Sequence, residues 1–310
     1  MKKLSNFIYK YRNKKILVFL DKLIYRFSEH NIISFSGSLV YFIILSVFPF
    51  IIALLNLLNF TNFINSDSIT YLIKYLPPEI SNVVMGFINE VSKNSSGELL
   101  SFSVILGFWS ASRGIKQFIK NINMAYGFKE KRGYIKLSAI SILFTIALMF
   151  MIIMLLLTQV FGKLIIEALI KYIGLTDEAR KIWSALNNII PLAYMIIIFA
   201  LLYIYSPSAD DRYRIRKKAI IPGSFFATFG TIIVTKFFSF YVSHFANYSV
   251  TYGSLGGIIV ILIWLWLMSM IILLGGEINA VTTYMITIKD NNYWPREESV
   301  MKKFIKNSDE

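Results

Sequence analysis

The sequence contains no cysteine and only two histidines, His30 and His244. The lack of cysteine excludes disulfides and thiolate metal sites. The HExxH, GxSxG and phosphate-loop motifs are absent as well, so no nucleophile, base or ligand set is visible. We therefore expect no metal, no cofactor and no enzymatic activity.

Charged residues are also scarce, at 16% of the chain against 56% hydrophobic residues, whereas soluble domains average about a quarter charged. The apolar residues form six runs. A membrane-spanning helix needs about 20 consecutive apolar residues. Five runs are long enough, and the second, LLSFSVILGFWSAS, is short. We predict an all-α polytopic transmembrane bundle with six spans, at about 32–60, 99–112, 138–162, 185–205, 219–245 and 254–283.

The few charges alternate along the chain. Of the 32 Lys and Arg residues, 25 lie in the arm 1–30, in 113–137, in 206–218 and in the tail 284–310. Excess cations mark cytoplasmic loops, so these regions and both termini are predicted to be cytoplasmic, and the short second run crosses the membrane. This topology divides the chain into the arm, a membrane domain over 31–284 and a charged tail over 285–310. It also accounts for the net charge of +14, so no nucleic-acid partner is expected.

Amphipathic stretches flank the spans. In the arm, Ile16, Leu20, Leu23 and Phe27 repeat at helical spacing among basic residues, which is typical of a helix lying on an anionic leaflet. Similar apolar stripes occur within 80–91 and 165–173. The two outer stripes either cap the bundle or form a lid over a path that opens outward.

Proline and glycine interrupt several spans. Pro49 lies within the first, Pro191 opens the fourth and Pro222-Gly223 opens the fifth. Gly223 begins a row of small residues, and Gly253 and Gly257 form a GxxxG pair, which favours close packing of helices. A dimer interface is the second interpretation, which leaves a homo-oligomer open.

Ionisable residues inside the spans are the strongest functional signal, because a charge near the bilayer centre costs at least about 2.5–3.5 kcal/mol. Lys236 lies about 25 Å from the cytoplasmic side and is able to snorkel outward. Glu277 lies about 10 Å from that side and needs to be neutral or paired. Arg113 is near the same level, so it either pairs with Glu277, directly or through Asn279 or water, or snorkels to head groups beside Lys116.

Four fragments, SGSLVYFIILSVFPF, GFWSASRGIKQFIKNINMAYG, YGSLGGIIVILIWLW and LLGGEINA, occur in this order along nearly the whole chain. In this the chain resembles the YihY/BrkB family of bacterial inner-membrane proteins, once described as ribonuclease BN. The resemblance implies a multi-pass protein of the bacterial plasma membrane with an envelope or transport role. The positions it carries over are Ser46, Pro49, Trp109, Arg113, Asn123, Gly253, Gly275, Glu277 and Asn279.

Three functions are compatible with these observations. The first is a transporter or flippase-like protein for an amphipathic or lipid-linked substrate, with membrane lipids as partners. The second is a structural or scaffolding membrane protein, and the third is the tRNA-processing ribonuclease of the old family description. A mid-membrane cavity lined by Arg113, Glu277 or Asn279 would favour transport, and a solid bundle would favour scaffolding.

The topology yields a direct test, because single cysteines are easily introduced into a cysteine-free chain. An impermeant thiol reagent applied outside intact cells is expected to label a cysteine at Asn94 and to leave one at Lys129 unlabelled. Labelling of Lys129 but not Asn94 would contradict the predicted orientation.

Overall fold

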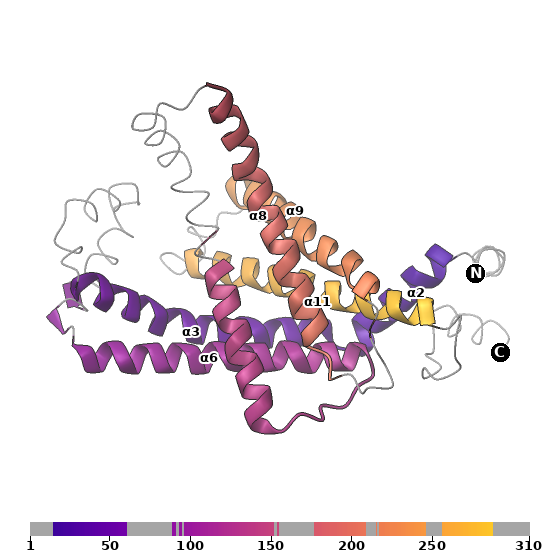
Figure 1. Cartoon of the computed structure of the whole chain (residues 1–310), viewed down its shortest axis with the longest axis horizontal. Coiled ribbons are helices and arrows are strands. Elements are labelled where there is room, and N and C mark those ends of the chain that lie inside the picture. Colours follow the sequence, from indigo (N-terminus) through magenta and orange to yellow (C-terminus); the bar gives the residue numbers. More distant parts are fainter. Residues whose placement is uncertain are drawn as a thin grey trace.

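A computed structural model describes residues 15–60, 89–90, 93–94, 96–151, 154, 177–208, 215, 217–245 and 256–287. This part of the chain contains helices and no strand, which confirms the predicted all-α class (Figure 1). Its helices are α2 (Lys15–Glu29), α3 (Ile32–Phe60), α6 (Gly97–Ala125), α8 (Asp177–Tyr205), the short 3₁₀ helix η2 (Lys217–Ala219), α9 (Ile221–Phe245) and α11 (Gly256–Thr287). A further helix runs from Tyr134 to Met151.

Four of these helices are long and apolar enough to cross a membrane: Ile32–Ala53, Tyr134–Met151, Lys217–Val242 and Gly256–Ile286. The apolar part of α8, Ile189–Tyr205, is shorter. The chain is therefore a membrane protein with several apolar helices, while the count of six spans stays a prediction. The outer stripes predicted at 80–91 and 165–173 lie almost entirely outside the described residues.

Helix α6 is much longer than the run predicted at 99–112. Ser96 caps its N-terminus, since the Ser96 hydroxyl accepts a hydrogen bond from the Leu99 amide at 3.0 Å. The helix then continues through its basic half to Ala125 and packs against α3. Apolar run length underestimated α6 because the run is interrupted by Arg113, Lys116 and Lys120, although the same stretch buries Phe118 and Ile122.

The α3–α6 pair is antiparallel, and its contacts follow the full length of both helices (Figure 1). The Ser96 amide lies 3.3 Å from Asn56 Oδ1 at one end. A Cβ on Gly107 would lie 3.4 Å from the ring of Phe50, and one on Gly114 would lie 3.2 Å from Phe42 Cβ. Since α6 accompanies α3 along its length, we keep the expectation that it crosses the membrane.

Helix α11 is the centre of the packing, because it contacts α2, α3, α6 and α9. Gly223 of α9 lies directly against the Gly275 carbonyl, and a Cβ on Gly276 would meet the side chain of Ile122. The Tyr203 hydroxyl donates a 2.6 Å hydrogen bond to the Ile272 carbonyl and joins α8 to the same helix. The predicted close approach at Gly223 and Gly275 is confirmed.

Two other predictions from helix breakers need correction or lie outside the described part. Pro191 is inside α8 and does not open it, because the helix already begins at Asp177. A Cβ on Gly257 would meet nothing within 4 Å, so this residue does not mark a packed helix crossing in the part of the chain that the structure describes. Its predicted partner Gly253 is outside the described residues, and Pro49 is inside α3 as expected.

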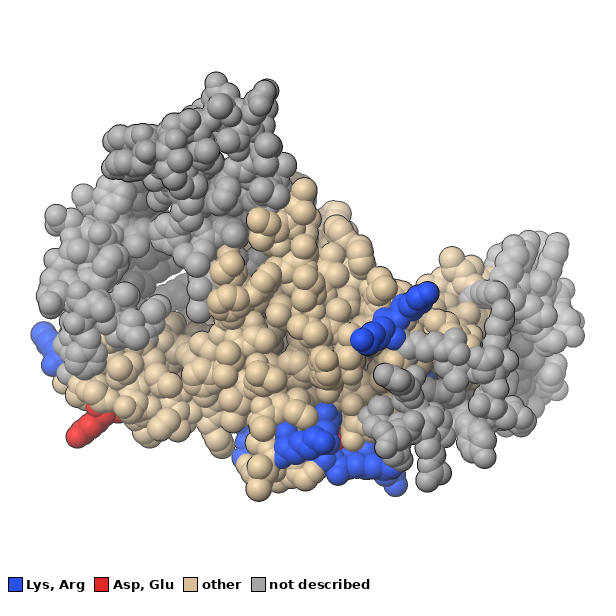
Figure 2. Space-filling view, viewed as in Figure 1, with Lys and Arg blue, Asp and Glu red and all other residues tan. Residues whose placement is uncertain are grey.

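The described Lys and Arg residues are unevenly placed on the surface. In the view of Figure 2 most of the blue atoms lie in the lower and right-hand parts of the described surface, and a broad tan area occupies the middle of the view. Helix α2 and the C-terminal end of α11 share one end, where Lys22 Nζ lies 4.2 Å from the ring centre of Tyr284. This placement suits two termini on one side of a membrane, and the cytoplasmic assignment stays a prediction.

The glycine contacts predict that Gly223→Ala and Gly275→Ala will each lower the free energy of unfolding by about 1–3 kcal/mol, because the new methyl group meets backbone that cannot move aside. The matched control is Gly257→Ala, where the methyl group enters open space. Thermal unfolding of the purified protein in detergent measures all three variants. Equal effects of the three substitutions would contradict the packing described here.

Candidate functional site: a buried ionic cluster

Glu277 on α11 is fully buried, with 0% of its side chain exposed. Its position follows from the two glycines before it, which let α8, α9 and α6 approach the backbone of α11 closely. A carboxylate enclosed in this way requires partners, because an isolated buried charge is very costly.

Two residues from the N-terminal part of the chain supply these partners. His30 Nδ1 lies 2.6 Å from Glu277 Oε1, a short hydrogen bond of the kind that charged groups form. Arg26 Nη1 lies 3.6 Å from Glu277 Oε2 and also donates a 2.7 Å hydrogen bond to the Ala125 carbonyl at the end of α6. The cluster thus joins α2, α6 and α11 through one guanidinium group.

The corner between α2 and α3 places His30. Asn31 has a φ of 48°, a left-handed conformation that asparagine tolerates better than most residues. The Asn31 backbone amide donates a 3.1 Å hydrogen bond to the Ser28 carbonyl, and α3 begins at the next residue. This is the usual way to end a helix, and it leaves His30 at the corner beside Glu277.

Helix α2 forms as predicted, and its polar face packs against the bundle, a contact that the amphipathic pattern alone did not indicate. Its charged residues Asp21, Lys22 and Arg26 are buried, whereas Ile16, Leu20 and Ile24 are 68%, 45% and 62% exposed. Because Glu277 and the α6 carbonyl end require cations, the polar face turns toward the bundle. The apolar face is left for the surroundings, which in a membrane are lipid.

The predicted partner of Glu277, Arg113, is not in this cluster. Arg113 is exposed, and its guanidinium carbon lies 5.0 Å from the ring centre of Trp109 on the same helix. Helices α6 and α11 are in contact. Of the two alternatives for Arg113, the exposed position agrees with snorkelling and not with the pair. Arg26 reaches Glu277 instead, from a helix that was predicted to lie on the membrane surface.

The other polar position carried over on α11 has a structural task. Asn279 is fully buried, and its Oδ1 accepts a 2.7 Å hydrogen bond from the Gly223 amide in the first turn of α9. Amides in the first turn of a helix lack partners within the helix, so Asn279 satisfies one of them. It acts on α9 and makes no bridge to Arg113.

The remaining predicted positions are spread over the molecule. Ser46 is buried and donates to the Ile43 carbonyl of its own helix at 2.7 Å, one turn before Pro49. Trp109 is 49% exposed. Lys236 is exposed on α9, as expected for a lysine that snorkels.

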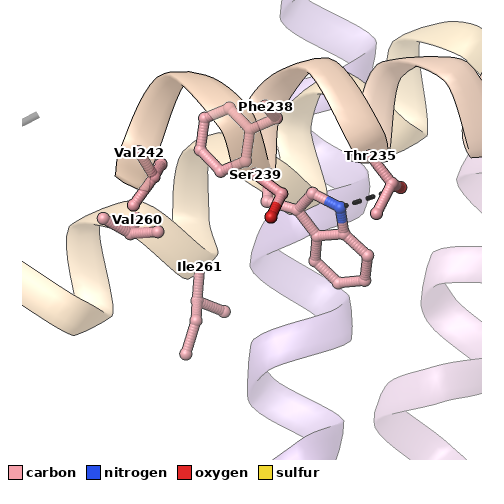
Figure 3. A pocket seen from close by; sticks show the side chains of 7 residues that line it. Thr235, Phe238, Ser239, Val242, Val260 and Ile261 are labelled. Atoms are coloured by element: carbon pink, nitrogen blue, oxygen red, sulfur yellow. Dashed lines mark hydrogen bonds between the residues drawn. The ribbon is translucent and has the colours of Figure 1, made fainter. Parts of the chain in front are cut away.

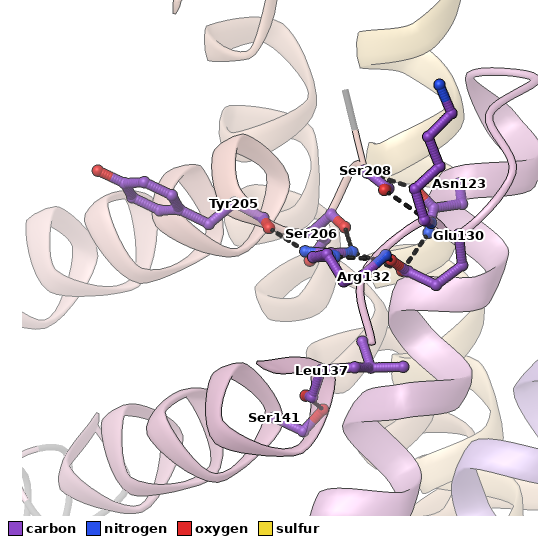
Figure 4. Close-up of polar contacts among 9 residues, drawn as sticks. Asn123, Glu130, Arg132, Leu137, Ser141, Tyr205, Ser206 and Ser208 are labelled. Atoms are coloured by element: carbon purple, nitrogen blue, oxygen red, sulfur yellow. Dashed lines mark hydrogen bonds and ion pairs between the residues drawn. The ribbon is translucent and has the colours of Figure 1, made fainter. Parts of the chain in front are cut away.

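Asn123 belongs to a second polar cluster, at the loop between α6 and the next helix (Figure 4). Its Oδ1 accepts from the Ser208 amide at 2.6 Å, and its Nδ2 donates to Glu130 Oε2 at 2.9 Å. Arg132 binds the same carboxylate at 2.6 Å and donates to the Ser206 carbonyl at 2.6 Å. The loop therefore holds the C-terminal end of α8.

The charge of Glu130 is stabilised in this clamp. Burial alone would raise its pKa, but hydrogen bonds from the Arg132 side chain and backbone, together with the Arg132 charge, lower the pKa to about 2. Such a group contributes stability above its ordinary pKa of 4.5 and loses it as the pH falls toward 2. The clamp is thus fully formed near neutral pH.

A cavity of about 390 Å³ lies between α9 and α11, and Arg113, Glu277 and Asn279 do not line it. In the described ranges no three His, Cys, Asp or Glu residues are grouped as metal ligands. The cluster is suited to holding helices together and to exchanging a proton between a carboxylate and an imidazole, the side chain that most often titrates near neutral pH.

Comparison with known proteins identifies the family. The model of the family described as "Virulence factor BrkB" matches residues 23–300, which include the C-terminal half of α2, the Glu277 cluster and α11. The chain belongs to the BrkB family. This confirms the resemblance stated from the sequence fragments.

Members of several bacterial groups are similar over most of their length. The ribonuclease-like protein YfkH of Bacillus subtilis (strain 168) is 38% identical over 274 residues, which cover 88% of this chain and 98% of YfkH. A UPF0761 membrane protein of Vibrio vulnificus (strain YJ016) is 23% identical over 95% of this chain and 90% of its own. A UPF0761 membrane protein of Pseudoalteromonas atlantica is 24% identical over 86% of each chain. No solved structure matches this chain.

The cluster predicts strong coupling between Arg26 and Glu277. Arg26→Met is expected to lower the free energy of unfolding by about 3–5 kcal/mol, because it removes the guanidinium partner of a buried carboxylate and leaves that carboxylate with His30 alone. In a Glu277→Gln background the same substitution should have a clearly smaller effect, since no buried charge remains to be compensated.

The measurement is a double-mutant cycle of thermal unfolding in detergent, with Arg113→Met as the matched control. The exposed Arg113 should tolerate the change with little loss. Additive effects of Arg26→Met and Glu277→Gln, or a large effect at Arg113, would contradict the assignment of partners.

Proposed function

We propose that this BrkB-family protein moves an amphipathic or lipid-linked molecule across the bacterial plasma membrane, with both termini in the cytoplasm. The observation that carries this proposal is the hydrogen-bonded carboxylate and imidazole of Glu277 and His30 inside a membrane helix bundle. Ionisable groups held within membrane domains commonly serve ion or proton relays. Helix packing alone is achieved more cheaply with small and neutral polar residues, as at Gly223 and Asn279.

The exposure of the two groups supports a relay. The Glu277 side chain is 0% exposed, whereas the His30 side chain is 17% exposed. His30 therefore connects the buried carboxylate with the surface of the helix corner. A proton taken up by His30 would change the strength of the contact that holds α2 on α11. Protonation would in this way be coupled to a helix movement.

Scaffolding is the second candidate, and one observation favours it. The space around Glu277 is filled by Arg26, His30 and close backbone contacts, and the described cavity lies elsewhere. In this alternative the ionic cluster only fixes the position of α2.

The word ribonuclease in the name of YfkH supplies a third candidate, but Nδ1 of His30 is engaged by Glu277, and His244 is at the far end of α9. We propose that the chain itself is not an enzyme.

Transport is tested with purified protein in liposomes that contain phosphatidylglycerol labelled with the fluorophore NBD. Dithionite destroys the fluorophore only in the outer leaflet, so lipid movement appears as additional loss of fluorescence. We expect the wild type to accelerate this loss severalfold over empty liposomes, with a rate that depends on an imposed pH gradient. Glu277→Gln should abolish the pH dependence, because it removes the buried carboxylate that His30 contacts.

Arg113→Gln is the matched control, since it removes an exposed charge outside the cluster. Wild-type protein that is folded, inserted and without effect on labelled phosphatidylglycerol under either direction of the gradient would overturn the lipid-transport proposal and favour the scaffold. A retained pH dependence in Glu277→Gln would overturn the role given to the cluster.

A further inference from the structure

A groove runs between α9 and α11 in the half of the bundle away from the ionic cluster. It has a volume of about 390 Å³ (Figure 3). Thr235 of α9 lies 14 residues after Ile221, about 21 Å along the helix, and Val260 is only about 6 Å from the start of α11. In the predicted topology this places the groove in the outer leaflet. Its lining residues are Thr235, Phe238, Ser239, Val242, Val260, Ile261 and Trp264.

The polar atoms at the floor of the groove are already used within the protein. Trp264 Nε1 donates to the Thr235 hydroxyl at 3.2 Å, as Figure 3 shows, and that hydroxyl lies 3.5 Å from Met268 Sδ. The rest of the lining is mainly hydrocarbon and aromatic carbon. A site with few free polar groups suits an apolar chain and not a polar solute.

The groove opens toward the surroundings of the bundle. Ile261, which lines it, is 55% exposed, and Ile258 one turn away is 57% exposed. Phe237 on the neighbouring face of α9 is 71% exposed. In a membrane such a surface meets lipid chains, so the occupant enters sideways from the leaflet.

A single cation marks one edge of this opening among the residues that α9 presents there. Lys236 is exposed, follows Thr235 directly and precedes Ser239 by three residues, a spacing that puts it beside Ser239 on the helix surface. A lysine within an apolar span is costly unless an anion or water meets its ammonium group. An anionic head group at the outer interface supplies that partner and would stand over the groove.

We propose that this groove binds one acyl chain of an anionic phospholipid of the outer leaflet, with the lipid phosphate held by Lys236. The site is separate from the Glu277 cluster and does not depend on transport, because a scaffold would bind the same lipid. A lipid without a phosphate fits the groove equally well but gains nothing from Lys236.

The test uses the full-length protein in nanodiscs that contain phosphatidylglycerol with a photoactivatable diazirine in one acyl chain, followed by peptide mapping. We expect cross-links within 235–242 and 260–264. Ile261→Trp fills the groove and should reduce this labelling severalfold. Ile233→Trp is the matched control, because Ile233 is 51% exposed on α9 but does not line the groove.

A second arm tests the charge. Lys236→Gln should lower labelling by phosphatidylglycerol severalfold and leave labelling by a diazirine diacylglycerol, which has no phosphate, unchanged. Equal labelling of Ile261→Trp and Ile233→Trp would overturn the groove, and an unchanged phosphatidylglycerol signal in Lys236→Gln would overturn the head-group contact. Val242→Trp replaces Ile261→Trp if the latter does not fold, and thermal unfolding in detergent checks each variant.

Discussion

Glu277 carries a charge into the centre of a membrane helix bundle, and the arrangement of the surrounding helices follows from its neutralisation. Arg26 and His30 are its partners, so α2 has to lie on α11. Arg26 also holds the C-terminal carbonyl of α6 at Ala125, which adds a third helix to the same contact. A buried ion pair seldom contributes much net stability, but loss of one partner is severe, so such a pair fixes one arrangement of helices over others.

The parts of the fold that could be predicted are those that depend on local sequence. A helix that consists of a single apolar run begins and ends where the run does. The bounds predicted for α3 and α11 are therefore close to those observed. Small residues before a buried charge indicate close backbone contact, and Gly223 against Gly275 agrees with this. The length of α6 was missed because its second half carries cations, which end an apolar run but not a helix.

The partners of Glu277 could not be found in this way, because His30 and Glu277 are 247 positions apart. Arg26 and His30 are four residues apart and so share one face of a helix, which was the available signal. An amphipathic pattern shows that a helix has two faces, but not which of them meets lipid and which meets protein. In α2, Arg26 contacts the buried Glu277. The estimated depth in the membrane had instead suggested Arg113 as the partner of Glu277.

The inverted burial of α2 has a consequence for biogenesis. Its inward face consists of charged residues whose counterpart is on α11, the last helix that the ribosome makes among those described. Until α11 has entered the bilayer, Arg26 and His30 lack Glu277, so α2 does not dock while most of the chain is synthesised. Docking of α2 then follows the synthesis of α11, and a chain truncated before Glu277 would leave α2 undocked.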